Sequence, residues 1–261
     1  MSTRTTKLGA IETRILSRPR PKKPVLVCGL PGSGYVGKLG ADYLVKTFKA
    51  QKVAEYYSPT FPPHVNITDD GQAHVMKAEV YYCGTQQAND LLIFTADAQP
   101  TTSKGEYELS DSVLRLAKKY SVKTVYSLAA YITGGFSKES RVFGTATSGG
   151  TVEALSKNGI QVMKEGGITG MNGIIIGMAP LHGMEGICLL GETSGYLIDA
   201  GASQSVLEAF SKLLQMKIDL SGLQEKAKET QQIIGQIQKM TEQPREPGAQ
   251  EKPARQPGYI G

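Results

Sequence analysis

Long apolar runs, paired cysteines and histidine clusters are all scarce in this chain, and each scarcity excludes a class of protein. No stretch approaches the roughly 20 apolar residues that a helix needs to cross a bilayer, and the N-terminus has no apolar signal core. The three cysteines, Cys28, Cys83 and Cys188, lie far apart inside apolar runs, which favours buried thiols over a disulfide framework or a zinc site. We therefore expect a cytoplasmic protein with no membrane partner.

Familiar catalytic spacings are missing as well. The three histidines do not form an H-E-x-x-H pattern, and there is no G-x-S-x-G elbow that would hold a serine nucleophile. The acidic residues Glu106, Glu108 and Asp111 are interpreted as the first turn of a helix, where the helix dipole favours negative charge. From these patterns we assign no catalytic residue, no metal site and no cofactor.

The positive charge is confined to one end of the chain. The formal net charge is +5, but residues 1–23 hold seven basic residues and one acidic residue, so the rest of the chain carries −1. A nucleic-acid-binding body is therefore not expected. We interpret residues 1–23 as a partly ordered, solvated arm, with contact to RNA or an acidic partner as the alternative.

Glycine is abundant, with 30 residues, and the stretch LPGSGYVGKLG at 30–40 resembles two phosphate-binding loops at once. Gly32, Gly34 and Gly37 match G-x-G-x-x-G, and Gly32 to Lys38 match G-x-x-x-x-G-K. A phosphate loop combines converging backbone N–H groups with a lysine and a hydroxyl that binds magnesium. Here Leu39 stands where that hydroxyl belongs.

The dinucleotide pattern is also incomplete. Glu55 lies 18 residues after Gly37, about where an acid that binds ribose belongs, but Gly29, Leu30 and Pro31 separate the strand from the first glycine. We favour a structural role, in which the glycines let a strand turn sharply into a helix that packs closely on a sheet. Nucleotide binding through this loop stays open as the alternative.

Apolar strand-like runs alternate with helical patterns from Lys23 onward, which predicts a three-layer α/β sandwich with a mainly parallel sheet. Residues 170–180 are ambiguous between a buried helix and a strand, and Ser103 is a candidate helix cap. The expected strands are 25–29, 52–57, 73–83, 91–97, 123–131, 142–147 and 185–192, and the expected helices begin near 36 or span 106–120, 149–158 and 203–216.

A heptad pattern follows this domain and predicts a helix over residues 220–240. Its apolar seam packs either on its own domain or between subunits of a homo-oligomer. The seam comprises Leu220, Leu223, Ala227, Thr230, Ile234 and Ile237. Residues 241–261 contain four prolines and few apolar residues, so we expect a disordered tail. The expected organisation is an arm at 1–23, an α/β domain at 24–219, the helix at 220–240 and the tail.

Several segments together resemble the archaeal branch of the proteasome assembly chaperone 2 family. They run in order from about Ile11 to Asp219 and include PVLVCGLPGSGYVGKLGADYL, LLIFTADAQP, VYSLAAYITG and GGITGMNGIIIGMAPLHGMEGICLLGETSGYLIDAGAS. The resemblance implies a sandwich similar to purine nucleoside phosphorylases, with no established catalytic site. It also implies that the glycine loop belongs to the shared fold.

The resemblance further implies a C-terminal hydrophobic-Tyr-any tripeptide that docks between α-ring subunits of the proteasome core particle. This chain ends Tyr259, Ile260, Gly261 after Gly258, so its tyrosine is third from the end and the pattern is displaced. We expect a non-enzymatic assembly chaperone or ATP-independent activator whose partners are the α-ring and copies of itself. The alternative is an ATP-grasp-like or phosphorylase-like enzyme that uses Lys38, Asp97 and Glu192.

Overall fold

The computed structural model describes residues 4–8, 11–134, 140–229 and 232. Its main strands are β1 (Arg4–Leu8), β2 (Ile11–Ile15), β3 (Val25–Gly29), β4 (Gln51–Tyr57), β7 (Ala78–Cys83), β8 (Leu91–Ala96), β9 (Thr124–Ile132), β10 (Val142–Ala146), β11 (Gln161–Val162) and β12 (Glu185–Thr193). They form one ten-stranded sheet in the order β1-β2-β4-β7-β8-β3-β9-β12-β10-β11. A separate hairpin comprises β5 (Val65–Ile67) and β6 (Ala73–Val75).

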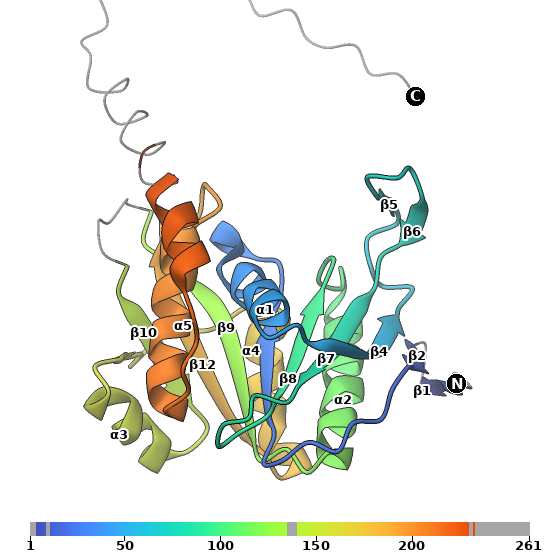
Figure 1. Cartoon of the computed structure of the whole chain (residues 1–261). Helices are drawn as coiled ribbons and strands as arrows, with labels where there is room; N and C mark the ends of the chain where they lie inside the picture. Colours follow the sequence, from blue (N-terminus) through green and yellow to red (C-terminus); the bar gives the residue numbers. More distant parts are fainter. Residues whose placement is uncertain (1–3, 9–10, 135–139, 230–231, 233–261) are drawn as a thin grey trace, which may run out of the picture.

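Helices cover both faces of the sheet (Figure 1). They are α1 (Val36–Thr47), α2 (Ser103–Lys119), α3 (Gly149–Lys157), α4 (Met171–Met178) and α5 (Ala200–Leu214), with 3₁₀ turns η1 (Ser33–Tyr35) and η2 (Ala179–His182) and a helical segment at 221–229. Helices α1 and α5 pack together on one face, and α2 and α4 pack together on the other, while α3 lies beside β10 and β11. The predicted three-layer α/β sandwich is confirmed.

The sheet is parallel in its centre and antiparallel on its flanks. Strands β8, β3, β9 and β12 run parallel to one another. On one flank β1, β2, β4, β7 and β8 pair antiparallel in turn, and on the other β10 pairs antiparallel with β12 and parallel with β11. In β3, Val25 and Val27 belong to the core under α1 and α5, and Leu26 and Cys28 belong to the core under α2 and α4. This strand is apolar throughout because both of its faces are covered.

Two local expectations need correction, and one choice that the sequence left open is decided. The expected strand at 73–83 is divided, since 73–75 pair within the hairpin and 78–83 pair with β4 and β8. Thr102 rather than Ser103 caps α2, because its side-chain oxygen accepts a 3.2 Å hydrogen bond from the N–H of Gly105. The ambiguous segment 170–180 is helical, as α4 followed by the start of η2.

The basic N-terminal arm supplies two strands at one edge of the sheet. Strand β2 pairs with β4, and the side chain of Ile11 is fully buried in the core beneath α2. An apolar anchor therefore attaches part of the arm to the domain.

No helix among the residues that the structure describes is long and apolar enough to cross a membrane.

The glycine loop brings α1 into backbone contact with the sheet. A Cβ atom on Gly37 would lie 2.1 Å from the carbonyl oxygen of Leu128 in β9, and one on Gly29 would lie 2.1 Å from the carbonyl oxygen of Gly37. Gly34 has a positive φ of 61°, a conformation that favours glycine. By contrast Gly32 is extended, and the nearest atom to its Cβ position is 3.9 Å away.

We expect Gly37→Ala to lower the free energy of unfolding by about 1–3 kcal/mol, because α1 would have to move away from β9. The matched control is Gly32→Ala, in the same loop, which should change stability by less than about 0.5 kcal/mol. Urea denaturation of both variants measures the difference. Equal stability of the two variants would contradict the packing role of Gly37.

Candidate functional site

A cavity of about 610 Å³ lies at the carboxyl ends of the central strands. Three segments contribute to its walls: the end of β9 from Ala129 to Ile132, the glycine loop at Gly32 and Ser33, and a second glycine-rich segment from Gly167 to Gly170. After β3 the chain continues through α1 to β4, which lies to one side of the β3–β9 pair in the strand order. After β9 it continues to β10, which lies to the other side of that pair. This point of divergence is where open α/β sheets usually place their ligands.

Gln99 connects the two glycine-rich segments that border the cavity. Its amide nitrogen donates a 2.6 Å hydrogen bond to the carbonyl oxygen of Pro31, and its amide oxygen accepts a 2.8 Å bond from the N–H of Met171 at the start of α4. Gly170 has a φ of +74°, and a Cβ there would come within 2.8 Å of that amide oxygen. The sequence analysis did not identify Gln99, because its two partners are about 70 residues away on either side.

The cavity offers few charges to a ligand. Among the described residues its ionisable side chains are Glu106, whose pKa is raised by burial, and Tyr131, and none of the described lining residues is a lysine or arginine. Asn172 is buried in its wall and accepts a 3.4 Å hydrogen bond from the hydroxyl of Ser127. The described walls therefore do not provide the cation that nucleotide loops supply to a phosphate.

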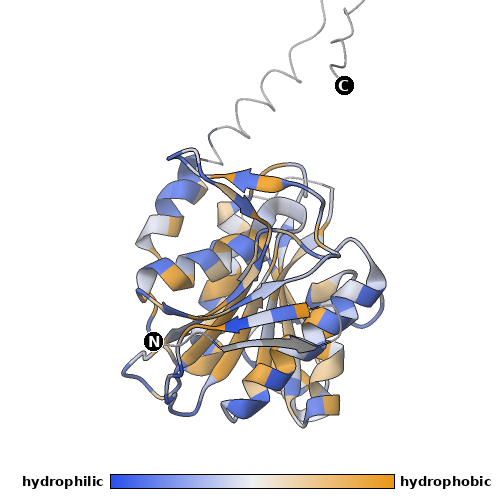
Figure 2. Ribbon diagram, turned by 90° about the vertical axis from the view of Figure 1, so that its right-hand side faces the viewer, coloured by the Kyte–Doolittle hydropathy of each residue, from blue (hydrophilic) through white to orange (hydrophobic). Residues whose placement is uncertain are grey.

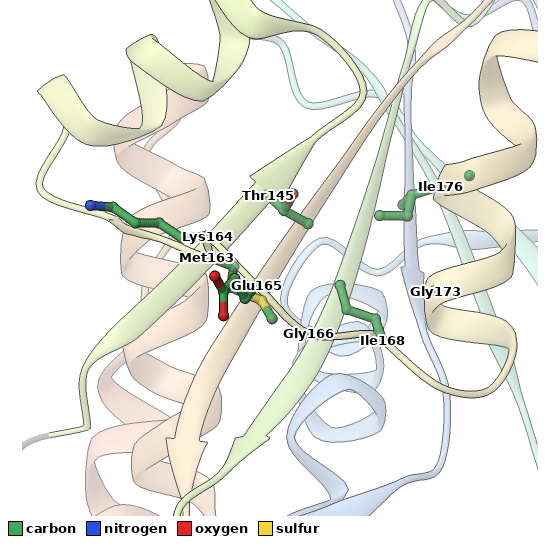
Figure 3. Close-up of a pocket in the computed structure, with 9 residues that line it drawn as sticks. Thr145, Met163, Lys164, Glu165, Gly166, Ile168, Gly173 and Ile176 are labelled. Carbon is green, nitrogen blue, oxygen red and sulfur yellow. The ribbon is translucent and has the colours of Figure 1, made fainter.

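A second cavity, of about 320 Å³, lies between the segment from Met163 to Ile168 and α4 (Figure 3). Thr145 and Ile176 contribute to its walls, and the side chain of Lys164 points away from Ile168 and Ile176. The walls combine aliphatic side chains and glycine backbone with two charged residues, Lys164 and Glu165. These two are adjacent in the chain, and within the described part of the chain they do not form an ion pair with each other.

Lys38, the lysine of the phosphate-loop pattern, is engaged elsewhere. Its ammonium group lies 2.8 Å from the carboxylate of Asp42 and 3.2 Å from the hydroxyl of Thr95 on β8. It is not among the residues that line the larger cavity. The structure therefore does not bring Lys38 together with the open side of the glycine loop.

Glu55, the candidate ribose acid, belongs to an ion-pair network on β4 and β7. Its carboxylate lies 2.7 Å from Lys77 and 3.0 Å from Lys52, and both lysines also contact Glu79. Burial alone would raise the pKa of Glu55, but hydrogen bonds from Lys77, Lys52 and Tyr57 outweigh it and lower the pKa to about 2. All four charged groups are paired, so this network is a satisfied sheet surface.

The remaining members of the enzymatic alternative are held by separate partners. Glu192 accepts two 2.8 Å hydrogen bonds from the guanidinium of Arg141, which lower the pKa of its carboxyl group. Asp97 accepts a 3.0 Å bond from the backbone N–H of Lys77. Within the described part of the chain, no three His, Cys, Asp or Glu side chains are grouped so that they could hold a metal ion.

The beginning of the heptad helix packs on its own domain. Leu223 and Ala227 are buried in the core beneath α1 and α5, and Leu220 packs against that core. The hydroxyl of Tyr43 in α1 accepts a hydrogen bond from the N–H of Gly222, which fixes the start of the helical segment. Thr230, Ile234, Ile237, Tyr259, Ile260 and Gly261 lie outside the described residues.

Exposed apolar side chains gather at the same edge as the larger cavity. Tyr35, Ile132, Tyr196 and Ile198 are all exposed, from 46% to 77%. The Cβ position of Gly195 lies 3.4 Å from Ile132 and 3.8 Å from Ser33, which shows that three loops meet here. The sequence analysis missed this group because its members come from three separate loops. Such a group is typical of a protein-binding surface.

Comparison with known proteins places these features in a family. The PAC2 family model matches residues 26–238. An uncharacterized protein of Methanocaldococcus jannaschii is 36% identical over 240 residues, covering 91% of this chain and 92% of its own length. The structure is similar to that of Pyrococcus furiosus PbaB, described as an archaeal proteasome activator, with 34% identity, a TM-score of 0.82, and coverage of 88% of this chain and 100% of PbaB.

Another similar structure is P. furiosus PbaA, described as an archaeal homolog of proteasome-assembly chaperone. It shows 26% identity and a TM-score of 0.71 over 87% of this chain and 92% of its own. These matches extend across the sandwich and agree with the family resemblance drawn from the sequence. The chain belongs to the PAC2 family.

Proposed function

We propose that this protein binds the proteasome core particle and acts on it without catalysing a reaction of its own. The observation that carries the proposal is the similarity to PbaB, an archaeal proteasome activator, which extends over the whole of that chain at 34% identity. Identity and TM-score are both higher with PbaB than with the chaperone homolog PbaA, which favours activation over assembly.

The placement of the polar residues supports a binding role. Lys38, Asp97 and Glu192 are each engaged by a different partner, and the described residues that line the larger cavity include no lysine or arginine. The three cysteines are free and buried, as expected for a reducing compartment, so we place the protein in the cytoplasm.

Nucleotide binding is the competing proposal, favoured by the position of the larger cavity. We expect isothermal titration with ATP, NAD and nucleosides, with and without magnesium, to give no micromolar binding, because no lysine or arginine is among the described residues that line that cavity. The control variant is Lys38→Ala. Micromolar binding by the natural chain that is lost in Lys38→Ala would replace our proposal with an enzymatic one.

The C-terminal residues Tyr259, Ile260 and Gly261 are proposed as the part that docks on the α-ring. The sequence places an aromatic residue, Tyr259, after a proline-rich segment that runs from Met240 to Gly258. Such a segment spans roughly 55 Å when extended at about 3.1 Å per residue. An aromatic anchor on a long segment of this kind fits a pocket between two subunits.

Deleting residues 259–261, or replacing Tyr259→Ala, should weaken binding to an archaeal-type core particle while leaving the melting temperature unchanged. An aromatic anchor contributes about 2 kcal/mol, or roughly thirtyfold in affinity, and several tails acting together enlarge the loss. Surface plasmon resonance on immobilised core particle measures binding, and hydrolysis of a fluorogenic peptide measures activation.

Tyr259→Phe is the matched control, since it keeps the ring and should retain most of the affinity. If the truncated protein and the Tyr259→Ala variant both bind like the natural chain, the contact lies in the sandwich and the proposed role of the tail is wrong.

We also propose that the protein is a homo-oligomer joined through the second half of the heptad seam. Leu223 and Ala227 pack within their own domain, so they contribute to folding. Ile234 and Ile237 continue the same apolar spacing and are the proposed subunit contact.

The double variant Ile234→Glu, Ile237→Glu should therefore lower the mass measured by light scattering, because it places charge in the seam. A double variant Gln232→Glu, Gln236→Glu adds the same charge off the seam and should leave the mass unchanged. Leu223→Ala should instead lower stability by about 2–5 kcal/mol. An oligomer that persists in the isoleucine variant would show that another surface joins the subunits.

A further inference from the structure

The β5–β6 hairpin presents an uncovered apolar face. Val65 pairs with Val75 and Ile67 pairs with Ala73, while Asn66 pairs with His74 between them. Successive side chains of a strand point to opposite faces, so the four apolar residues share one face and the two polar residues share the other. The hairpin is therefore amphipathic, although it belongs to no larger sheet among the described strands.

This apolar face lies in solvent. Val65 is 47% exposed, Ile67 is 63% exposed and Val75 is 58% exposed. None of the three belongs to either apolar core cluster or packs against one. Figure 2 shows hydrophobic residues on this hairpin at the upper edge of the molecule. Cross-strand pairs of β-branched residues on one face typically have a covering layer, which is absent within the described part of this chain.

Both ends of the hairpin are held in place. In the turn, the N–H of Thr68 bonds the carbonyl of Gln72 at 3.0 Å, and Gly71 takes a φ of +80°. At the base, the carbonyl of Thr60 accepts hydrogen bonds from the N–H and the hydroxyl of Thr101, just before α2. The apolar face is thus presented in a defined position rather than on a loose loop.

The hairpin projects from the edge at which the described chain ends. It connects the end of β4 to the start of β7, at the carboxyl edge of the central strands (Figure 1). Ala227 reaches that edge as well, because it lies near Gly201 at the start of α5. The start of α5 lies at the edge because the N–H of Asp199, just before this helix, donates a hydrogen bond to the carbonyl oxygen of Gly34 in the glycine loop. This edge of the domain therefore faces a partner that binds the C-terminal tail.

We propose that the apolar face of Val65, Ile67, Ala73 and Val75 is a second contact with the proteasome core particle, additional to the C-terminal tail, an inference that rests on the proposed function above. Four side chains of this size offer only a few hundred Å², well below the roughly 1,000 Å² of a stable independent interface. The face consequently adds to a contact that the tail has already made, rather than forming a dimer by itself.

The turn indicates the chemistry of the surface that it meets. Asp69 and Asp70 sit at the tip of the hairpin and are exposed, while residues 65–75 include no lysine or arginine and His74 lies on the opposite, polar face. The complementary surface is an apolar patch with basic side chains at its border. Such charges raise the rate of association more than the lifetime of the complex.

The experiment compares full-length proteins on immobilised archaeal-type core particle. The double variant Ile67→Thr, Val75→Thr keeps β-branched residues in the strands and removes apolar surface, so it should bind about tenfold more weakly. The control Asn66→Thr, His74→Thr alters the opposite face of the same hairpin and should bind like the natural chain. Thermal unfolding and light scattering of each variant verify the fold and the mass.

Weaker binding by the apolar-face variant alone, at unchanged mass and melting temperature, supports the inference. Equal binding by that variant and the natural chain overturns it and leaves the proposed function standing. Failure of the natural chain to bind the core particle overturns both. A mass that falls only in the apolar-face variant assigns the face to self-association and overturns the inference too. If the double variant unfolds early, Ile67→Thr alone gives the same comparison.

Discussion

The backbone contact between α1 and the sheet determines the position of the glycine loop, of one wall of the larger cavity and of the exposed edge beside it. Gly29 and Gly37 have no side chains, so the first turn of α1 lies directly against the carbonyl oxygen of Leu128. That contact sets where the glycine loop crosses the ends of β3 and β9, and so defines one wall of the larger cavity. It also places Tyr35 at the exposed edge, next to the loops after β9 and β12. A side chain at Gly37 would disturb all of these together.

Charge and apolar surface are distributed very differently over the molecule. The ion pairs of Glu55 with Lys77 and of Glu192 with Arg141 are internally satisfied, and they stabilise the flanks of the sheet. The apolar side chains at the carboxyl edge and on the β5–β6 hairpin, by contrast, have no covering layer among the described residues. Paired charges need no further partner, whereas exposed β-branched and aromatic groups gain free energy when another surface covers them. This contrast is typical of a binding protein.

Several site residues escaped the sequence because their meaning depends on distant neighbours. In the sequence, Gln99 is simply a polar residue that follows a strand. The fold shows that its side chain connects Pro31 to Met171 through hydrogen bonds. Lys38 fits a phosphate-loop pattern, but the fold places its ammonium group against Thr95, 57 residues further along the chain, as well as against Asp42 one helical turn away. The spacing of residues along the chain shows which of them are near in sequence. It does not show which partner forms an ion pair or hydrogen bond with a charged side chain in the fold.

The sandwich, most of its strands and helices, and the family could be predicted from the sequence, because alternating periodicity and ordered motifs are local properties of the chain. The missing hydroxyl of a nucleotide loop at Leu39 is also visible in the sequence. The pairing of residues 73–75 in a hairpin apart from the sheet, and the packing of Leu223 inside its own domain, could be seen in the folded structure alone. Register and helix docking are decided by contacts between segments far apart in sequence, so the same apolar pattern is compatible with burial in the chain or against a partner.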